Sequence, residues 1–151
     1  DAGTTVYCVG YNVDMLAVAP TAALTSPTNV WEVFYEYAFN AVMNGESFDT
    51  NWCQGYEADA VTLTPLGPSC APGTQEKVDE TIAAIKDGSL HVFDTSKFTV
   101  GKTVTTAFAT DTDGDFVPDA DEAVFDGYYH ESYFQAAPSF QLRIDGITEL
   151  N

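Results

Sequence analysis

Two amphipathic helix patterns, preceded and separated by short runs of β-branched residues, constrain the fold of this chain more than any other feature. The first pattern begins near Asn29 and stops at Asn44-Gly45; the second covers residues 75–87 and stops at Gly88. In each, apolar side chains recur at the i, i+3 and i+4 spacing of one helix face. We therefore expect an α/β fold with these apolar faces packed inside: Trp31, Phe34, Tyr35, Ala38 and Val42 in the first helix, and Val78, Ile82 and Ile85 in the second.

Capping and turn residues indicate where the remaining elements begin and end. Asn29 is expected to cap the first helix, because Glu32 three residues later completes a capping-box pattern. The first strand ends at Gly10, and a polar loop, residues 11–14, follows at its carboxyl end, which is where ligands usually bind in open α/β sheets. Extended structure is expected at residues 4–9, 22–25, 58–64, 90–93, 128–134 and 140–144, with a hairpin of residues 98–100 and 103–108 around Gly101-Lys102.

Composition excludes several classes of protein. The chain has 151 residues, of which 45% are hydrophobic, including ten Phe, eight Tyr and two Trp, so it can build a core and is not disordered. Twenty-three acids against five bases give a net charge of −18, which repels phosphate backbones and excludes nucleic acid as a partner. No apolar run approaches the roughly 20 residues of a membrane span.

Cysteine and histidine usage gives no sign of catalysis. Cys8 lies in an apolar run and is expected to be a core residue, whereas the sequence leaves open whether Cys53 and Cys70 pair. His91 lies in a strand-like run, and His130 lacks the second histidine that a zinc helix needs. The chain also has no Gly-x-Ser-x-Gly elbow and no phosphate-binding glycine loop. We expect a protein without enzymatic activity.

An acidic loop, residues 111–122, is the strongest motif in the second half of the chain. Its carboxylates match the EF-hand ligand positions 1, 3, 5, 9 and 12, and they alternate as calcium coordination requires. Phe116 stands at position 6, where that loop needs glycine, and Pro118 stiffens the backbone. No cofactor is required; Ca²⁺ binding and a solvated acidic loop both remain open. The candidate ligands are Asp111, Asp113, Asp115, Asp119 and Glu122.

Several segments, in order along nearly the whole chain, resemble the basic membrane protein (BMP) family of solute-binding lipoproteins, which includes purine nucleoside receptors. "VYCVGYNVD" at residues 6–14 resembles the family's strand and its Gly-hydrophobic-Asp-x-Asp loop. Residues 22–45 resemble its Leu-Thr-Ser segment and following helix, and residues 74–94 resemble a late helix that ends Ile-x-x-Gly-x-x-x-x-Phe. "DGYYHESYFQAAPSFQLRIDGITELN" looks like the tail of acidic members.

The resemblance implies a type I periplasmic-binding architecture of two Rossmann-like lobes joined by a hinge. In that family these motifs lie in the second half of a longer protein, so residues 1–151 are expected to be its C-terminal portion, with parts of both lobes and the N-terminal half absent. The resemblance implies that the full-length protein is an extracellular, cell-surface lipoprotein that serves an ABC importer. It would capture a small polar molecule by lobe closure and present it to a membrane permease. Self-association could supply the missing strands.

The resemblance also points to the ligand contacts. The loop carboxylate that binds a ligand ribose falls at Asn12, and a ligand-contacting lysine falls near Asn29. Both residues are amides here, which puts a nucleoside in doubt as the ligand, and a turn role for Asn12 and helix capping for Asn29 are the alternatives. Asp14 matches the family pattern, and Ser26 completes the predicted contacts. Two rival classes stay open: a Ca²⁺-stabilised cell-surface module and a ligand-sensing receptor domain not tied to transport.

Overall fold

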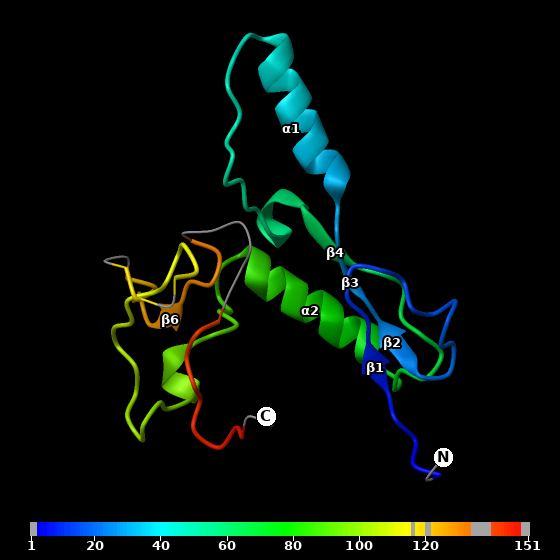
Figure 1. Ribbon diagram of the computed structural model, residues 1–151. Helices are drawn as coiled ribbons and strands as arrows, with labels where there is room; N and C mark the ends of the chain where they lie inside the picture. Colours follow the sequence, from blue (N-terminus) through cyan, green and yellow to red (C-terminus); the bar gives the residue numbers. More distant parts are fainter. Residues whose placement is uncertain (1–2, 116, 120–121, 134–139, 149–151) are drawn as a thin grey trace. The chain divides into compact units, whose positions relative to one another are not determined.

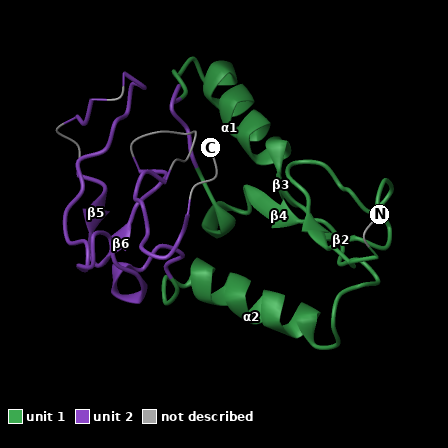
Figure 2. Ribbon diagram, turned by 60° about the horizontal axis from the view of Figure 1, so that its bottom comes forward, with its two compact units in different colours: residues 1–48, 54–90 green, residues 49–53, 91–151 purple. Residues whose placement is uncertain are grey.

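The computed structural model describes residues 3–115, 117–119, 122–133 and 140–148. Helices and short strands are mixed along them, so the chain is α/β in the general sense. Two compact units are formed, each described separately below: unit 1 comprises Asp1–Phe48 and Gln54–Leu90, and unit 2 comprises Asp49–Cys53 and His91–Asn151 (Figure 2). Within the described residues, no helix is both long enough and apolar enough to cross a membrane.

Unit 1 is built on one extended segment that has neighbours on both edges. The segment consists of β2 (Ala23–Thr25) and β3 (Pro27–Asn29), which Ser26 separates (Figure 1). β1 (Cys8–Val9) pairs with β2 in parallel, and β4 (Val61–Leu63) pairs with β3 antiparallel. The carbonyls of Thr25 and Pro27 accept from the β1 side, whereas those of Leu24 and Ser26 accept from residues after β4. Because successive carbonyls of a strand point to opposite edges, the segment lies between β1 and β4.

The junction at Ser26 is closely packed. Ser26 has no exposed surface, and its N–H donates to the Thr64 hydroxyl over 2.9 Å. The Thr25 hydroxyl donates to the Thr64 carbonyl over 2.7 Å. Two glycines stand where the surrounding atoms leave no room for a Cβ. A Cβ at Gly67 would lie 2.2 Å from the Ala23 carbonyl oxygen, and one at Gly10 would lie 2.3 Å from the Ser26 hydroxyl oxygen.

The two helices end where the sequence predicts, but the first does not begin as expected. α1 (Trp31–Met43) and α2 (Thr74–Lys86) are each followed by a glycine in the left-handed region, Gly45 and Gly88. The predicted capping box is wrong: Asn29 belongs to β3, and the cap residue, Val30, makes no side-chain cap hydrogen bond. Pairing with β4 keeps this backbone extended, because Asn29 pairs with Val61 and Val30 donates to the Ala60 carbonyl.

The aromatic face of α1 is not the core element that its periodicity predicts. Trp31 is 55% exposed and Val42 60% exposed, and Ala41 is the buried residue of the helix. Phe34 contacts the rings of Tyr37 and Phe48. Cys8, also predicted to be buried, is exposed, as is its strand neighbour Val9. All three cysteines are free.

Unit 2 is organised around a short hairpin. β5 (Val124–Phe125) and β6 (Tyr128–Tyr129) pair antiparallel across Asp126 and Gly127, which both have positive φ, as a type I′ turn requires. The Tyr129 ring is 1% exposed and packs edge-on against Phe93. Its buried neighbours are Ala123, Val124 and Leu142, and Phe93, Phe98, Val100, Phe108 and Phe140 surround them.

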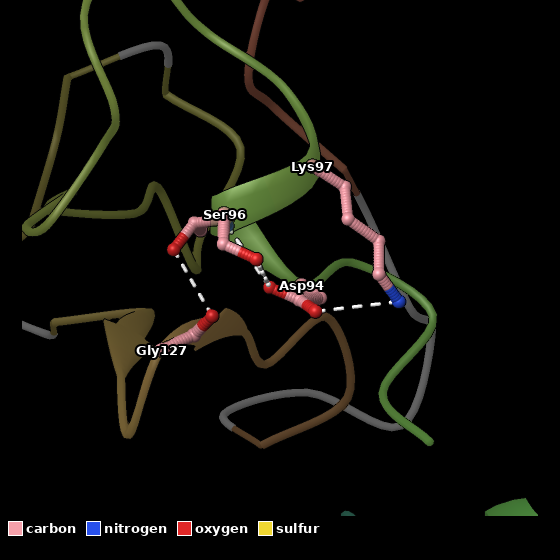
Figure 3. Close-up of polar contacts among 5 residues, drawn as sticks. Asp94, Ser96, Lys97 and Gly127 are labelled. Carbon is pink, nitrogen blue, oxygen red and sulfur yellow. Dashed lines mark hydrogen bonds and ion pairs between the residues drawn. The ribbon is translucent and has the colours of Figure 1, made fainter.

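A short 3₁₀ helix, η2 (Thr95–Lys97), is attached to this hairpin by its first residues (Figure 3). The Asp94 carboxylate accepts from the Ser96 N–H over 2.9 Å and pairs with Lys97. Hydrogen bonds from Ser96 lower the Asp94 pKa. The N–H and hydroxyl of Thr95 both donate to the Gly127 carbonyl, over 2.9 and 3.0 Å.

The remaining predicted strands are shorter than expected or absent. The strands predicted at residues 4–9 and 22–25 are observed only as the shorter β1 and β2. The strand predicted at residues 58–64 overlaps the last residue of η1 (Tyr56–Ala58), and only β4 within it is a strand. Residues 90–93 and 140–144 form no strand, and the hairpin at Gly101-Lys102 is one bridge, Val100 with Thr103. Of residues 128–134, β6 covers the first two, and residue 134 lies outside the described residues. A strand persists only where a neighbour offers successive hydrogen bonds, which propensity alone does not encode.

The close approach at Gly67 gives a stability test. Gly67→Ala is expected to lower the free energy of unfolding by about 1–3 kcal/mol, because the new methyl group would overlap the Ala23 carbonyl, a backbone atom that cannot rotate away. Gly55→Ala is the matched control, since its nearest neighbour is the flexible end of Glu57. Urea denaturation measures both. Equal losses in the two variants would contradict the tight packing between this loop and β2.

Candidate functional site

The predicted ligand loop, residues 11–14, directly follows β1 at its carboxyl end. Asn12 donates its N–H to the Pro27 carbonyl over 2.9 Å, and its own carbonyl accepts from the Thr28 hydroxyl over 3.0 Å. Asn12 has φ of 63°, a left-handed conformation that asparagine tolerates better than most residues. The backbone of the loop is therefore fixed to β3, while the Asn12 side chain is exposed.

Asp14 fixes the next turn of the same loop. One carboxylate oxygen accepts from the Leu16 N–H over 2.9 Å, and the side chain is exposed. Tyr11, immediately before Asn12, is 82% exposed. Nothing in the sequence singles out Tyr11 beyond its place in the loop, yet its aromatic ring is exposed in the same loop as the polar side chains of Asn12 and Asp14.

The four predicted ligand-contact residues divide into two groups. Asn12, Asp14 and Asn29 are exposed, and Asn29 directly follows Thr28, the residue that binds the Asn12 carbonyl. Ser26 is fully buried, and its hydroxyl accepts from the Met15 N–H over 3.4 Å. In this structure Ser26 therefore supports the loop from inside rather than facing a ligand.

The acidic loop brings three of its five predicted metal ligands together. Carboxylate oxygens of Asp111, Asp113 and Asp115 lie within 4.8 Å of one another. One oxygen of each accepts an N–H of the loop itself, from Gly114, Asp115 and Val117 respectively. Carboxylate oxygens are hard ligands of the kind that Ca²⁺ prefers. The residues present therefore fit a hard divalent ion in ligand type.

Asp119 and Glu122 are not part of this cluster, and their carboxylates accept hydrogen bonds from other groups. Asp119 accepts from the N–H of Thr112 over 2.8 Å and from its hydroxyl, and these hydrogen bonds lower the Asp119 pKa. Glu122 accepts from the N–H groups of Phe108 and Val124. Gly114 has φ of 82°, so the tight turn comes two residues earlier than in an EF-hand.

The start of the acidic loop is anchored to a distant segment of unit 2. The Asp111 N–H donates to the Gln141 side-chain oxygen over 3.1 Å, and the Gln141 amide donates to the Asp111 carbonyl over 2.9 Å. A single side-chain amide thus satisfies both backbone groups of Asp111 and fixes the first carboxylate of the cluster.

A cavity of about 430 Å³ lies between α2, β4 and η1, apart from the predicted ligand loop. Its apolar wall includes Val78, Ile82 and Ile85. The periodicity correctly groups these residues on one face, but it assigns that face to the core. No residue of α2 is fully buried, so the helix lines a cavity instead.

Both histidines lie in one stack of rings in unit 2. The His91 ring is 3.7 Å from Tyr128, Tyr128 is 3.7 Å from His130, and His130 is 3.4 Å from Phe125 (centroid distances). Among the described residues, the buried Nδ1 of His130 has no hydrogen-bond partner. Burial lowers the His130 pKa, and the nearby His91 acts in the same direction.

Comparisons with known proteins give no family assignment. No protein-family model and no curated protein matches the chain. Among solved structures, "Crystal Structure of a Transcriptional Activator of comK gene from Bacillus halodurans" is similar with 15% sequence identity and a TM-score of 0.49. The similarity covers 57% of this chain and 30% of that one. At that level it assigns neither fold nor function.

The His130 ring gives a pH prediction. Its folded-state pKa lies below the ordinary value of 6.5, so the unfolded chain takes up a proton first as the pH falls through that value. The free energy of unfolding is expected to decrease across this window and to level off below the folded pKa. Burial raises the pKa of Glu131 above its ordinary value of 4.5. Its effect on the free energy of unfolding therefore has the opposite sign, and it applies in the more acidic window that begins at pH 4.5. Urea denaturation at a series of pH values measures the slope.

His130→Phe is the control, because it retains a ring in the stack and removes the titrating group. The slope near pH 6.5 is expected to flatten in this variant. An unchanged slope would assign the effect to another group.

Proposed function

We propose that the chain is part of an extracellular solute-binding protein of an ABC importer, which binds a small polar molecule without transforming it and presents it to a membrane permease. The observation that carries this proposal is the loop beyond β1. It follows a strand that pairs in parallel with β2, it is fixed through its backbone, and it exposes Tyr11, Asn12 and Asp14 together. The carboxyl end of a parallel strand is where α/β proteins usually bind ligands.

The resemblance to BMP-type lipoproteins supports the finer description. It implies that the fold is of the type I periplasmic-binding kind and that the full-length protein is a cell-surface lipoprotein. The passage of the chain between unit 1 and unit 2 at three points, after Phe48, Cys53 and Leu90, suits a protein whose chain crosses a hinge repeatedly.

The chemistry of the loop suits a ligand with an aromatic or heterocyclic ring and hydroxyl groups. Tyr11 offers a stacking surface, Asp14 keeps an acceptor oxygen, and the Asn12 amide offers both a donor and an acceptor. A sugar hydroxyl pair is bound best by a carboxylate, which accepts two hydrogen bonds. Asn12 therefore favours a ligand that also has an acceptor for the amide to donate to.

The proposal is tested by titrating purified protein with a panel of nucleosides and their free bases in a calorimeter. Asn12→Gly removes the amide and keeps the positive φ, and it is expected to weaken binding about tenfold, or about 1.4 kcal/mol. Asn12→Asp, which supplies a carboxylate, is expected to strengthen binding of nucleosides but not of free bases. Asn44→Ala, at another exposed asparagine, is the control and should bind as the wild type does.

Binding that is identical in Asn12→Gly and the wild type would rule out this loop as the ligand site. If no member of the panel binds, native mass spectrometry of protein isolated from its native host is the next measurement. A retained small molecule would support solute capture, and its absence would count against it.

A Ca²⁺-stabilised cell-surface module is a second candidate, favoured by the clustering of Asp111, Asp113 and Asp115. Adding Ca²⁺ is then expected to raise the melting temperature in a concentration-dependent way, because an ion that binds only the folded chain stabilises it. Asp113→Asn should abolish the gain, and Glu46→Gln, an exposed acid outside the cluster, should retain it. Differential scanning calorimetry measures the shift. An equal gain in both variants would indicate nonspecific screening of the net charge.

A further inference from the structure

The cavity between α2, β4 and η1 has the dimensions and wall chemistry of a ligand site. Its volume of about 430 Å³ lies within the range of roughly 300–1,000 Å³ that is typical of small-molecule sites. Leu63 of β4 and Pro72 before α2 complete the wall begun by Val78, Ile82 and Ile85. Water in contact with these side chains is released when an apolar group replaces it, which favours occupation.

The charge of the cavity lining differs from that of the rest of the chain. The chain has 23 acids and five bases, yet the ten residues that line the cavity include no acid and one base, Lys77. Lys77 pairs with Glu80 over 2.5 Å, and both side chains are largely exposed. Exposed pairs of this kind are weak, so a ligand anion can replace Glu80 at little cost.

The other polar groups of the lining are hydroxyls. Thr74 donates to the Ala71 carbonyl and Thr81 to the Lys77 carbonyl, both over 2.7 Å, which leaves their oxygens as acceptors. Burial raises the pKa of the Tyr56 phenol, which keeps it neutral and able to donate. The walls are connected by an ion pair of 2.5 Å between Lys86 of α2 and Asp59 at the end of η1.

We propose that this cavity binds an amphipathic organic anion, a molecule with a planar apolar body and one carboxylate or sulfonate group. The body lies along Val78, Ile82 and Ile85, and the anionic group pairs with Lys77. This site is separate from the loop of Asn12 and Asp14, and the proposal does not depend on solute capture at that loop.

Two fluorescent probes with related aromatic bodies test the proposal on the whole chain. The anionic probe is 8-anilinonaphthalene-1-sulfonate, and the neutral one is N-phenyl-1-naphthylamine. Both are expected to bind saturably with one site. Ile82→Glu is expected to weaken both by about tenfold or more, because it places a charge in the apolar wall. Lys77→Gln is expected to weaken the anionic probe about threefold and to leave the neutral probe unchanged.

The exposed face of α1 is the competing location, and Phe39→Ser, at a residue 69% exposed there, controls for it. The proposal requires that this variant bind both probes as the wild type does. Loss of binding in Phe39→Ser, unchanged binding in Ile82→Glu, or the absence of saturable binding would overturn it. An equal effect of Lys77→Gln on both probes would overturn the choice of an anion. Circular dichroism checks folding, and Val78→Gln replaces Ile82→Glu if the latter does not fold.

Discussion

The pairing of both edges of the segment from Ala23 to Asn29 is the interaction on which unit 1 depends. Strands of two or three residues have little stability alone, because few hydrogen bonds offset the entropy lost on ordering the backbone. Here β1 and the residues after β4 use opposite edges of the same segment, and Thr64 fills the junction at Ser26. The same pairing holds the loop of Asn12 in place. Position and exposure of the candidate ligand groups thus follow from backbone hydrogen bonds.

Local sequence signals predicted local features well. Gly45 and Gly88 mark the ends of the helices because the left-handed conformation after a helix suits glycine, and that preference needs no distant partner. The spacing of Asp111, Asp113 and Asp115 likewise brought three carboxylates together, because alternate residues of one tight loop are close wherever it lies. The general α/β class and the position of the loop at the end of β1 also follow from the order of the elements.

Features that depend on distant partners could not be predicted. Asn29 has the residue type of a cap, but pairing with Val61 makes it part of a strand. Glu122 has the spacing of a calcium ligand, but it lies outside the cluster of Asp111, Asp113 and Asp115, and its carboxylate accepts from the N–H of Phe108, 14 residues earlier. The stripe of α2 predicts an apolar face without indicating whether protein covers it. In each case the periodicity or motif is present, and a contact outside it decides the outcome.

The exposed face of α1 has a consequence for how the protein behaves in concentrated solution. Four large side chains that recur at every fourth residue of α1 are at least half exposed, on a molecule whose net charge is −18: Trp31, Tyr35, Phe39 and Met43. Electrostatic repulsion between copies then opposes the attraction of their apolar faces. The range of that repulsion is about 10 Å at 0.1 M salt and about 3 Å at 1 M. Ionic strength therefore sets the colloidal behaviour of this protein, with the acidic surface acting as a salt-dependent barrier to contact through α1.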